Sequence, residues 1–131
     1  MQNFYEALPT LKRLKSEAAR AASMGWMKGL DGRILSIGSE HLALSVYLQG
    51  GETVIMRLAN LLWYSKAKKE GLNFKQCAWV HDEWQTEVDA DQAERLGEIQ
   101  VQSIIDAGTH FNLNCPMDGE AKIGRNWLET H

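Results

Sequence analysis

The stretch "CAWVHDEWQTEV", residues 77–88, decides the predicted fold, because an apolar run meets consecutive ionisable residues and then resumes. The ionisable residues separate two segments that have the composition of strands, 76–80 and 84–88. We therefore predict a tight hairpin with these residues at its tip. Adjacent strand residues face opposite ways, so two neighbouring acids serve one cleft only at such a turn. The tip residues are His81, Asp82 and Glu83.

Upstream of this hairpin, residues 40–69 carry an apolar pattern that predicts one long helix. Apolar residues occupy much of its circumference, so we expect the helix to be largely buried. Ser39 can cap its start, and Gly71 can end it. The pair Gly50-Gly51 costs roughly 1 kcal/mol per residue relative to alanine, which indicates close packing or a bend at that point.

The N-terminal third supplies shorter elements. Residues 4–23 have the spacing of a helix, and Pro9 fits best in its first turn. Residues 26–37 predict a second hairpin, because Asp31-Gly32 is a strong turn signal between short extended segments.

Downstream of residues 77–88, the sequence "VDADQAERL" opens another predicted helix, with Asp89 or Asp91 as its cap. Residues 111–124 predict one more strand followed by a turn. No repeat or Pro/Gly-rich linker divides the chain, so we expect one α+β domain over residues 1–131, with helices packed on a small antiparallel sheet. The buried face of the downstream helix is expected at Ala93, Leu96, Val101, Ile104 and Ile105.

Composition limits the classes of protein. A chain of 131 residues with 44% hydrophobic content suits one globular domain. No apolar run reaches the roughly 18 residues of a membrane span and no signal peptide is recognisable, so we expect a soluble cytoplasmic protein with no membrane contact. The net charge of −3 argues against nucleic-acid binding through general electrostatics alone, but local contacts stay open. Cys77 and Cys115 form no CxxC pair, and we expect buried free thiols.

The hairpin tip is the first candidate site. Carboxylates on a rigid turn are good ligands for a hard cation, and Mg²⁺ favours one or two of them together with water and substrate phosphate. Nucleotidyl transfer commonly uses two such ions roughly 4 Å apart. A solvated acidic turn without function is an equally open reading of these residues. A zinc site lacks ligand spacing, and a serine hydrolase lacks a GxSxG pattern.

The long helix carries the second candidate site. His41, Ser45 and Gln49 recur at every fourth position and form one polar stripe. Such a stripe can donate hydrogen bonds to the minor groove of DNA, which presents nearly the same acceptors for every base pair. The alternative is that these residues mark the solvent side of the helix.

Four motifs, taken together, resemble the C-terminal part of family A DNA polymerases, a group that includes bacterial DNA polymerase I and podovirus-type phage polymerases. They occur in the order and spacing of that family, and the phage branch is more similar. The motifs are "KGLDGR" at 28–33, "LQGGETVI" at 48–55, "WVHDE" at 79–83 and "GRNWLETH" at 124–131. The resemblance implies the C-terminal half of a polymerase palm, with the family's motif C on the hairpin.

The resemblance also implies roles for the tip. Asp82 would be a catalytic ligand of Mg²⁺ in a two-metal site, and Glu83 would be an accessory catalytic acid. His81 would contact the primer end. His131 would lie close to the palm core.

For the helix stripe, the resemblance implies contacts with DNA. Gln49 matches the glutamine that contacts the minor groove of the primer–template, and His41 lies where the phage branch also carries histidine. Ser45 departs from the family's usual asparagine, which weakens the implied base contact there.

Parts of such a polymerase have no counterpart in this sequence, namely the upstream motif with the first metal-binding aspartate and the helix that grips the incoming nucleotide. We therefore expect no polymerisation by this chain alone, and activity only with an upstream polymerase chain, primer–template DNA and dNTP. A naturally split polymerase and a truncated gene piece both fit. The alternatives are a non-catalytic, self-associating interaction module and, less favoured, an independent metal-dependent nuclease or phosphatase.

Overall fold

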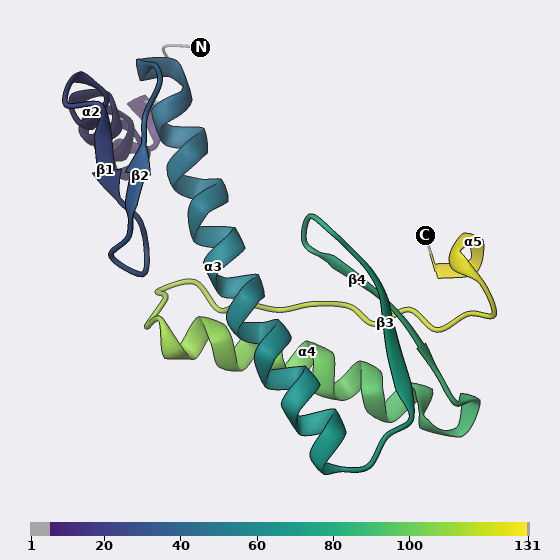
Figure 1. The fold of residues 1–131 in the computed structure, drawn as a ribbon. Coiled ribbons are helices and arrows are strands. Elements are labelled where there is room, and N and C mark those ends of the chain that lie inside the picture. The colour runs from purple at the N-terminus through teal and green to yellow at the C-terminus, as the bar shows by residue number, and fades with distance from the viewer. Residues whose placement is uncertain (1–5, 131) are drawn as a thin grey trace. The chain divides into compact units, whose positions relative to one another are not determined.

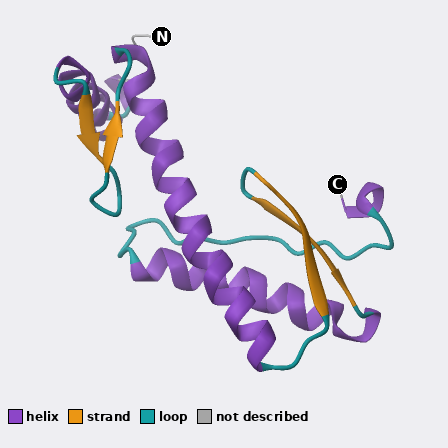
Figure 2. Ribbon diagram, in the orientation of Figure 1, coloured by secondary structure: helices purple, strands orange, loops and turns teal. Residues whose placement is uncertain are grey.

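A computed structural model describes residues 6–130 and confirms the α+β class. Helices alternate with two separate antiparallel hairpins, each forming its own two-stranded sheet (Figures 1 and 2). The chain divides into two compact units, Met1–Val54 and Ile55–His131. The single domain over residues 1–131 stays a prediction.

The first unit begins with helix α2, Pro9–Ser23, which has proline in its first turn as predicted. The first part of the predicted helix, residues 4 and 5, lies outside the described residues. Gly25 has φ +77°, a conformation that glycine adopts without strain, and it ends the helical run.

The first hairpin follows directly. Strand β1, Trp26–Lys28, pairs with β2, Ile34–Ser36, and the chain turns at Asp31-Gly32 as predicted. Gly32 has φ +82°. The buried residues of this unit form a small cluster from α2, the segment after β2 and the start of α3, namely Ala18, Ile37 and Ala43.

Helix α3, Glu40–Lys69, has the bounds that the sequence predicts. Its 30 residues correspond to a length of roughly 45 Å. At its C-terminal end the N–H of Leu72 donates to the Ala67 carbonyl at 3.1 Å, and that of Gly71 to the Lys68 carbonyl at 3.1 Å. This pattern, with Gly71 at φ +75°, is a Schellman C-cap.

The expectation that α3 is largely buried is wrong for much of its surface. Small and bulky residues on one side are buried, but several large apolar residues are exposed, because the described chain covers only part of the circumference. Close packing is confirmed at Gly50, where a Cβ would lie 3.1 Å from Leu35 Cδ1, but not at Gly51, where a Cβ would meet nothing within 4 Å. The exposed side chains are Leu42, Leu48, Leu61, Leu62 and Tyr64.

The second hairpin, in the second unit, has longer strands than predicted. Strand β3, Phe74–Val80, pairs with β4, Glu83–Val88, and a bulge lies between Gln76 and Ala78. The predicted three-residue tip is corrected to two residues, because Glu83 is the first residue of β4 and pairs with Val80.

A turn of 3-10 helix, η1 at Ala90–Gln92, leads into α4, Ala93–His110. Of the two predicted caps, Asp89 stands at the N-cap position of η1, whereas Asp91 lies within it and Gln92 precedes α4. The side chain of Asp89 makes no capping bond, and its carboxylate accepts from Asn73 Nδ2 at 2.9 Å. Of the predicted buried face, Leu96 is buried and the others are half-buried. The buried residues of α4 are Leu96, Gly97, Ile99, Ser103, Ala107 and Gly108.

The strand predicted within residues 111–124 is absent, since these described residues adopt irregular structure before the short helix α5, Trp127–Thr130. The segment runs back along α4 (Figure 1) and lies against its glycines. A Cβ on Gly97 would lie 2.8 Å from the Ala121 side chain, and one on Gly108 would lie 2.5 Å from that of Met117. Packing on a helix therefore replaces pairing with a strand.

The core of the second unit is aromatic. Trp63 from α3 is fully buried, with its ring centroid 5.3 Å from Phe74 of β3 and 5.8 Å from Trp84 of β4. Ala67 of α3 belongs to the same cluster, and Leu96 and Ile99 of α4 complete it. The core fixes the base of the second hairpin against both helices.

The prediction of buried thiols is wrong, because Cys77 and Cys115 are both free and exposed. Cys77 lies at the bulge of β3 and Cys115 in the irregular segment, two places that the core does not reach. Among the described residues, no helix has the length and apolar character to cross a membrane.

Candidate functional site

The tip of the second hairpin is a braced turn. His81 has φ +54°, an uncommon conformation for a residue with a side chain. Its carbonyl accepts a hydrogen bond from Trp79 Nε1 at 2.9 Å, and Trp79 pairs across the strands with Trp84 at a ring distance of 6.3 Å. Cross-strand aromatic pairs stabilise a hairpin, so the tip is held although it is exposed.

The two acids of the tip differ in their surroundings. Asp82 is exposed, and no described residue forms a hydrogen bond or ion pair with its carboxylate. Glu83 is half-buried and accepts a hydrogen bond from the Gln85 amide. Asp82 is therefore available to an external ligand, whereas Glu83 is oriented by its own strand.

Gln85 is a residue that the sequence-based site prediction missed. It donates to Glu83, and its own oxygen accepts from Thr130 Oγ1 of α5 at 3.5 Å. Residues two apart on a strand share a face, so the spacing of positions 83 and 85 was the available signal.

The carboxylates of the tip are the kind of ligand that Mg²⁺ prefers, because a hard cation favours carboxylate oxygens and often takes only one or two from the protein. Among residues 6–130, no group of three or more His, Cys, Asp or Glu side chains is placed to hold a metal ion. These oxygens are of the type that Mg²⁺ takes, but they do not make a full site, and Asp82 as a metal ligand stays a prediction.

The stripe on α3 lies in the first unit. His41, Ser45 and Gln49 are all exposed, and in the described chain no partner bonds their side chains. Helical spacing puts them within an arc of roughly 80°. The stripe thus lies on an exposed side of α3, and its contact with DNA stays a prediction. His131, assigned to the palm core, lies outside the described residues.

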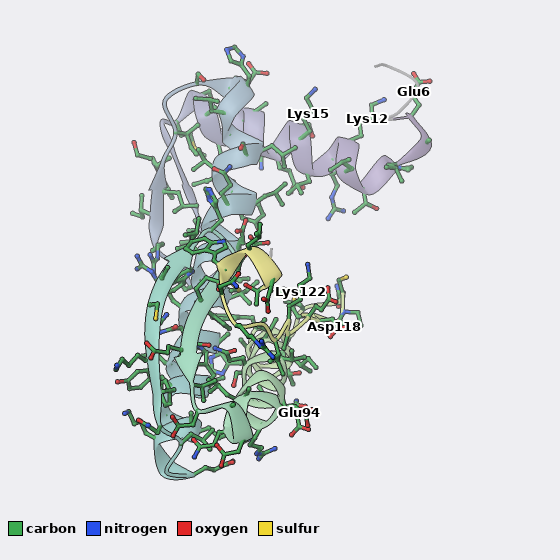
Figure 3. All side chains as sticks on the ribbon, turned by 90° about the vertical axis from the view of Figure 1, so that its right-hand side faces the viewer. Glu6, Lys12, Lys15, Glu94, Asp118 and Lys122 are labelled. Carbon is green, nitrogen blue, oxygen red and sulfur yellow. The ribbon has the colours of Figure 1, made fainter. Side chains whose placement is uncertain are left out.

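Basic side chains gather on α2, where Lys12 and Lys15 project from the helix (Figure 3). Arg13 is partly compensated by Glu17, with 3.3 Å between Nε and Oε1. Both groups are well exposed, so this pair adds little stability.

The tip of the first hairpin also carries an acid. The Asp31 carboxylate accepts from Arg33 Nε at 2.7 Å and from the Arg33 N–H at 3.2 Å. The guanidinium hydrogen bond is the main reason that the pKa of Asp31 is lowered from its ordinary value of 3.8. This acid is occupied within its own turn.

Residues 10–129 match the model of DNA polymerase family A. The DNA-directed DNA polymerase of Enterobacteria phage T3 is 34% identical over 113 residues, which are 81% of this chain and 16% of that polymerase. The corresponding enzyme of Escherichia phage T7 is 33% identical over 116 residues, with the same coverages, 81% and 16%. DNA polymerase I of Aquifex aeolicus is 31% identical over 107 residues, which are 80% of this chain and 19% of that enzyme.

A solved structure shares the fold: the POL domain of Pol1 from M. smegmatis, in complex with DNA primer-template and dNTP. The TM-score is 0.79 at 20% identity, over 99% of this chain and 25% of that one. This chain therefore spans a small part of the length of its relatives, and it corresponds to a segment of a larger polymerase domain. With the family match over most of its length, the chain belongs to DNA polymerase family A.

Proposed function

We propose that this chain supplies one acidic ligand of a two-metal nucleotidyl-transfer site in a DNA-directed DNA polymerase. The observation that carries the proposal is Asp82, an exposed carboxylate without a protein partner at a braced hairpin tip, in a family A chain. The remaining ligands and the nucleotide-gripping helix come from an upstream polymerase segment, on the same chain or on another.

Each tip residue has a separate task in this proposal. Asp82 would be the protein ligand of Mg²⁺, and Glu83, oriented by Gln85, would stay beside it as an accessory acid. When bound, the metal ions activate the attacking oxygen and stabilise the leaving one. His81 contacts the primer end through its exposed side chain, while its carbonyl accepts from Trp79 and braces the turn.

The α3 stripe reads the duplex in the same proposal. Gln49 and His41 donate hydrogen bonds to minor-groove acceptors, which are nearly the same for every base pair and so permit any sequence. Ser45 has a shorter side chain than the family's usual asparagine and contributes the weakest contact of the three.

Primer extension tests this function. The chain is mixed with an upstream family A segment that carries the first metal-binding aspartate, and incorporation of dNTP is measured with Mg²⁺. We expect templated extension by the mixture and none by either component alone. An inactive mixture in which both components are folded, by circular dichroism, would contradict the proposal.

A second candidate function is a self-associating, non-catalytic module. The exposed leucines of α3, including Leu61 at 67% and Leu42 at 54% exposure, favour it, because such apolar surface drives association. Light scattering distinguishes the two: self-association that the upstream segment cannot displace supports the second function.

A further inference from the structure

An open groove of about 680 Å³ lies in the second unit, away from the hairpin tip. The C-terminal half of α3 forms most of its lining, and β3 contributes a single side chain, that of Gln76. The lining residues are Asn60, Leu61, Tyr64, Ser65, Lys68, Lys69 and Gln76.

The groove has an apolar surface and a fixed polar end. Leu61 and Tyr64, which line the groove, are 67% and 44% exposed and give it an apolar surface. At the polar end, Gln76 Nε2 donates to Asn60 Oδ1 at 2.9 Å, and Trp63 Nε1 donates to the same oxygen at 3.1 Å. The bond from Gln76 ties the strand to the helix, and the bond from Trp63 orients the Asn60 side chain within the helix, so this end of the groove is held in place.

The other end of the groove is positively charged. Lys68 Nζ lies 4.8 Å from the centre of the Phe74 ring, and this contact holds the ammonium in place without neutralising it. Within residues 6–130, no carboxylate forms an ion pair with Lys68 or Lys69. The nearby acid Glu70 is occupied, since both of its oxygens accept from Arg95 at 2.8 Å.

We propose that this groove is the docking site for a segment of a partner protein that presents an apolar side chain beside one or two carboxylates. An exposed leucine next to tyrosine gains stability from an apolar side chain, which a phosphate backbone does not offer. Charge complementarity therefore selects an acidic, apolar protein segment, and this docking does not depend on nucleotidyl transfer.

The experiment is an NMR titration of the isotope-labelled full chain with a synthetic peptide, N-acetyl-Glu-Glu-Leu-Phe-Leu-Glu-amide. We expect shift changes confined to residues 60–69 and Gln76. The counterpart peptide with Lys in place of each Glu is expected to bind roughly tenfold more weakly.

Two variants and a control complete the design. Lys69→Glu should lower the affinity for the acidic peptide by roughly tenfold and raise the affinity for the basic peptide. Leu61→Ser should lower the affinity for both peptides. Lys122→Glu changes the same charge on an exposed residue outside the groove and should leave binding within about twofold. All three substitutions are at exposed sites, and heteronuclear spectra report whether each variant is folded.

Equal binding of the two peptides, or shift changes outside the groove, would overturn the proposal. Tighter binding of an oligo-dT strand than of the acidic peptide at the groove would also overturn the proposal, because it would identify a nucleic-acid surface. Groove shift changes that depend only on protein concentration would identify a second copy of the chain and would overturn it as well.

Discussion

The two hairpins of this chain each carry an aspartate at the tip, in opposite situations. Asp31 of the first hairpin is bound by Arg33, with Oδ2 at 2.6 Å from Nη2 and 2.7 Å from Nε. Asp82 of the second hairpin has no partner among the described residues. An acid in a turn is thus not a site in itself. The useful distinction is whether the protein already satisfies the carboxylate.

The backbone conformations of the two turns also differ. In the first, Gly32 takes the positive φ of +82°, which costs glycine little. In the second, His81 takes a positive φ of +54°, where a side chain costs roughly 1–2 kcal/mol. Two-residue hairpin turns favour positive φ, so the second turn places on a histidine a cost that the first turn avoids with glycine.

The largest expected effect concerns the base of the second hairpin. Trp63→Ala removes a fully buried ring that packs on both strands, and should lower the free energy of unfolding by about 3–5 kcal/mol. Urea denaturation followed by circular dichroism measures this loss. A loss under about 1 kcal/mol would mean that the second hairpin does not depend on its aromatic core.

The next effect tests the turn of the first hairpin, where glycine takes the positive φ. Gly32→Ala should cost about 1–2 kcal/mol through its positive φ alone, since a Cβ there meets nothing within 4 Å. Gly51→Ala is the matched control, because that Cβ is also unobstructed but lies within α3, where alanine should stabilise by about 1 kcal/mol. Changes of the same sign, measured by thermal unfolding, would contradict the assigned conformations.

The strained turn should respond in the opposite direction. His81→Gly relieves the positive φ, and the greater chain entropy of glycine offsets part of the gain, so we expect stabilisation by about 0.5 kcal/mol. Thermal unfolding of this variant beside Gly32→Ala gives the comparison. Destabilisation by more than about 1 kcal/mol would mean that the histidine ring, and not its backbone, supports the hairpin.

The smallest effect is the pH response of the first hairpin. The pKa of Asp31 is lowered in the folded state, mainly by the Arg33 hydrogen bond. Its contribution to stability is therefore present above the ordinary value of 3.8 and is lost as the pH falls through the lowered pKa. The Arg33 amide shift in an acid titration should report this transition. Asp31→Asn should abolish it, and an unchanged titration in that variant would refute the assignment.

The sequence predicts the helices and turns well because their signals are local. The bounds of α3 follow from Ser39, Glu40 and Gly71, and the first hairpin follows from Asp31-Gly32. The strand predicted in residues 111–124 is wrong, because a strand needs a neighbouring strand to pair with, and the local sequence pattern does not specify one.

The burial of a side chain and its hydrogen-bond partners are harder to predict than whether a segment is helix or strand. The leucines of α3 have the composition of a core helix, yet Leu42 and Leu61 are exposed, because burial depends on which elements cover the helix. Likewise, the tip residues are recognisable from sequence, but the bond between Gln85 and Glu83 and the absence of a partner at Asp82 appear only in three dimensions.

The most direct test compares the two tip aspartates in one assay. The rate of single-nucleotide incorporation is measured for the chain completed by its upstream polymerase segment, with Asp82→Asn beside Asp31→Asn. Loss of a carboxylate that holds a catalytic metal removes several kcal/mol of transition-state stabilisation, so Asp82→Asn should slow incorporation by about a thousandfold, and Asp31→Asn by less than about twofold. Comparable rates for both variants, with both folded, would contradict the assignment of Asp82 as a metal ligand.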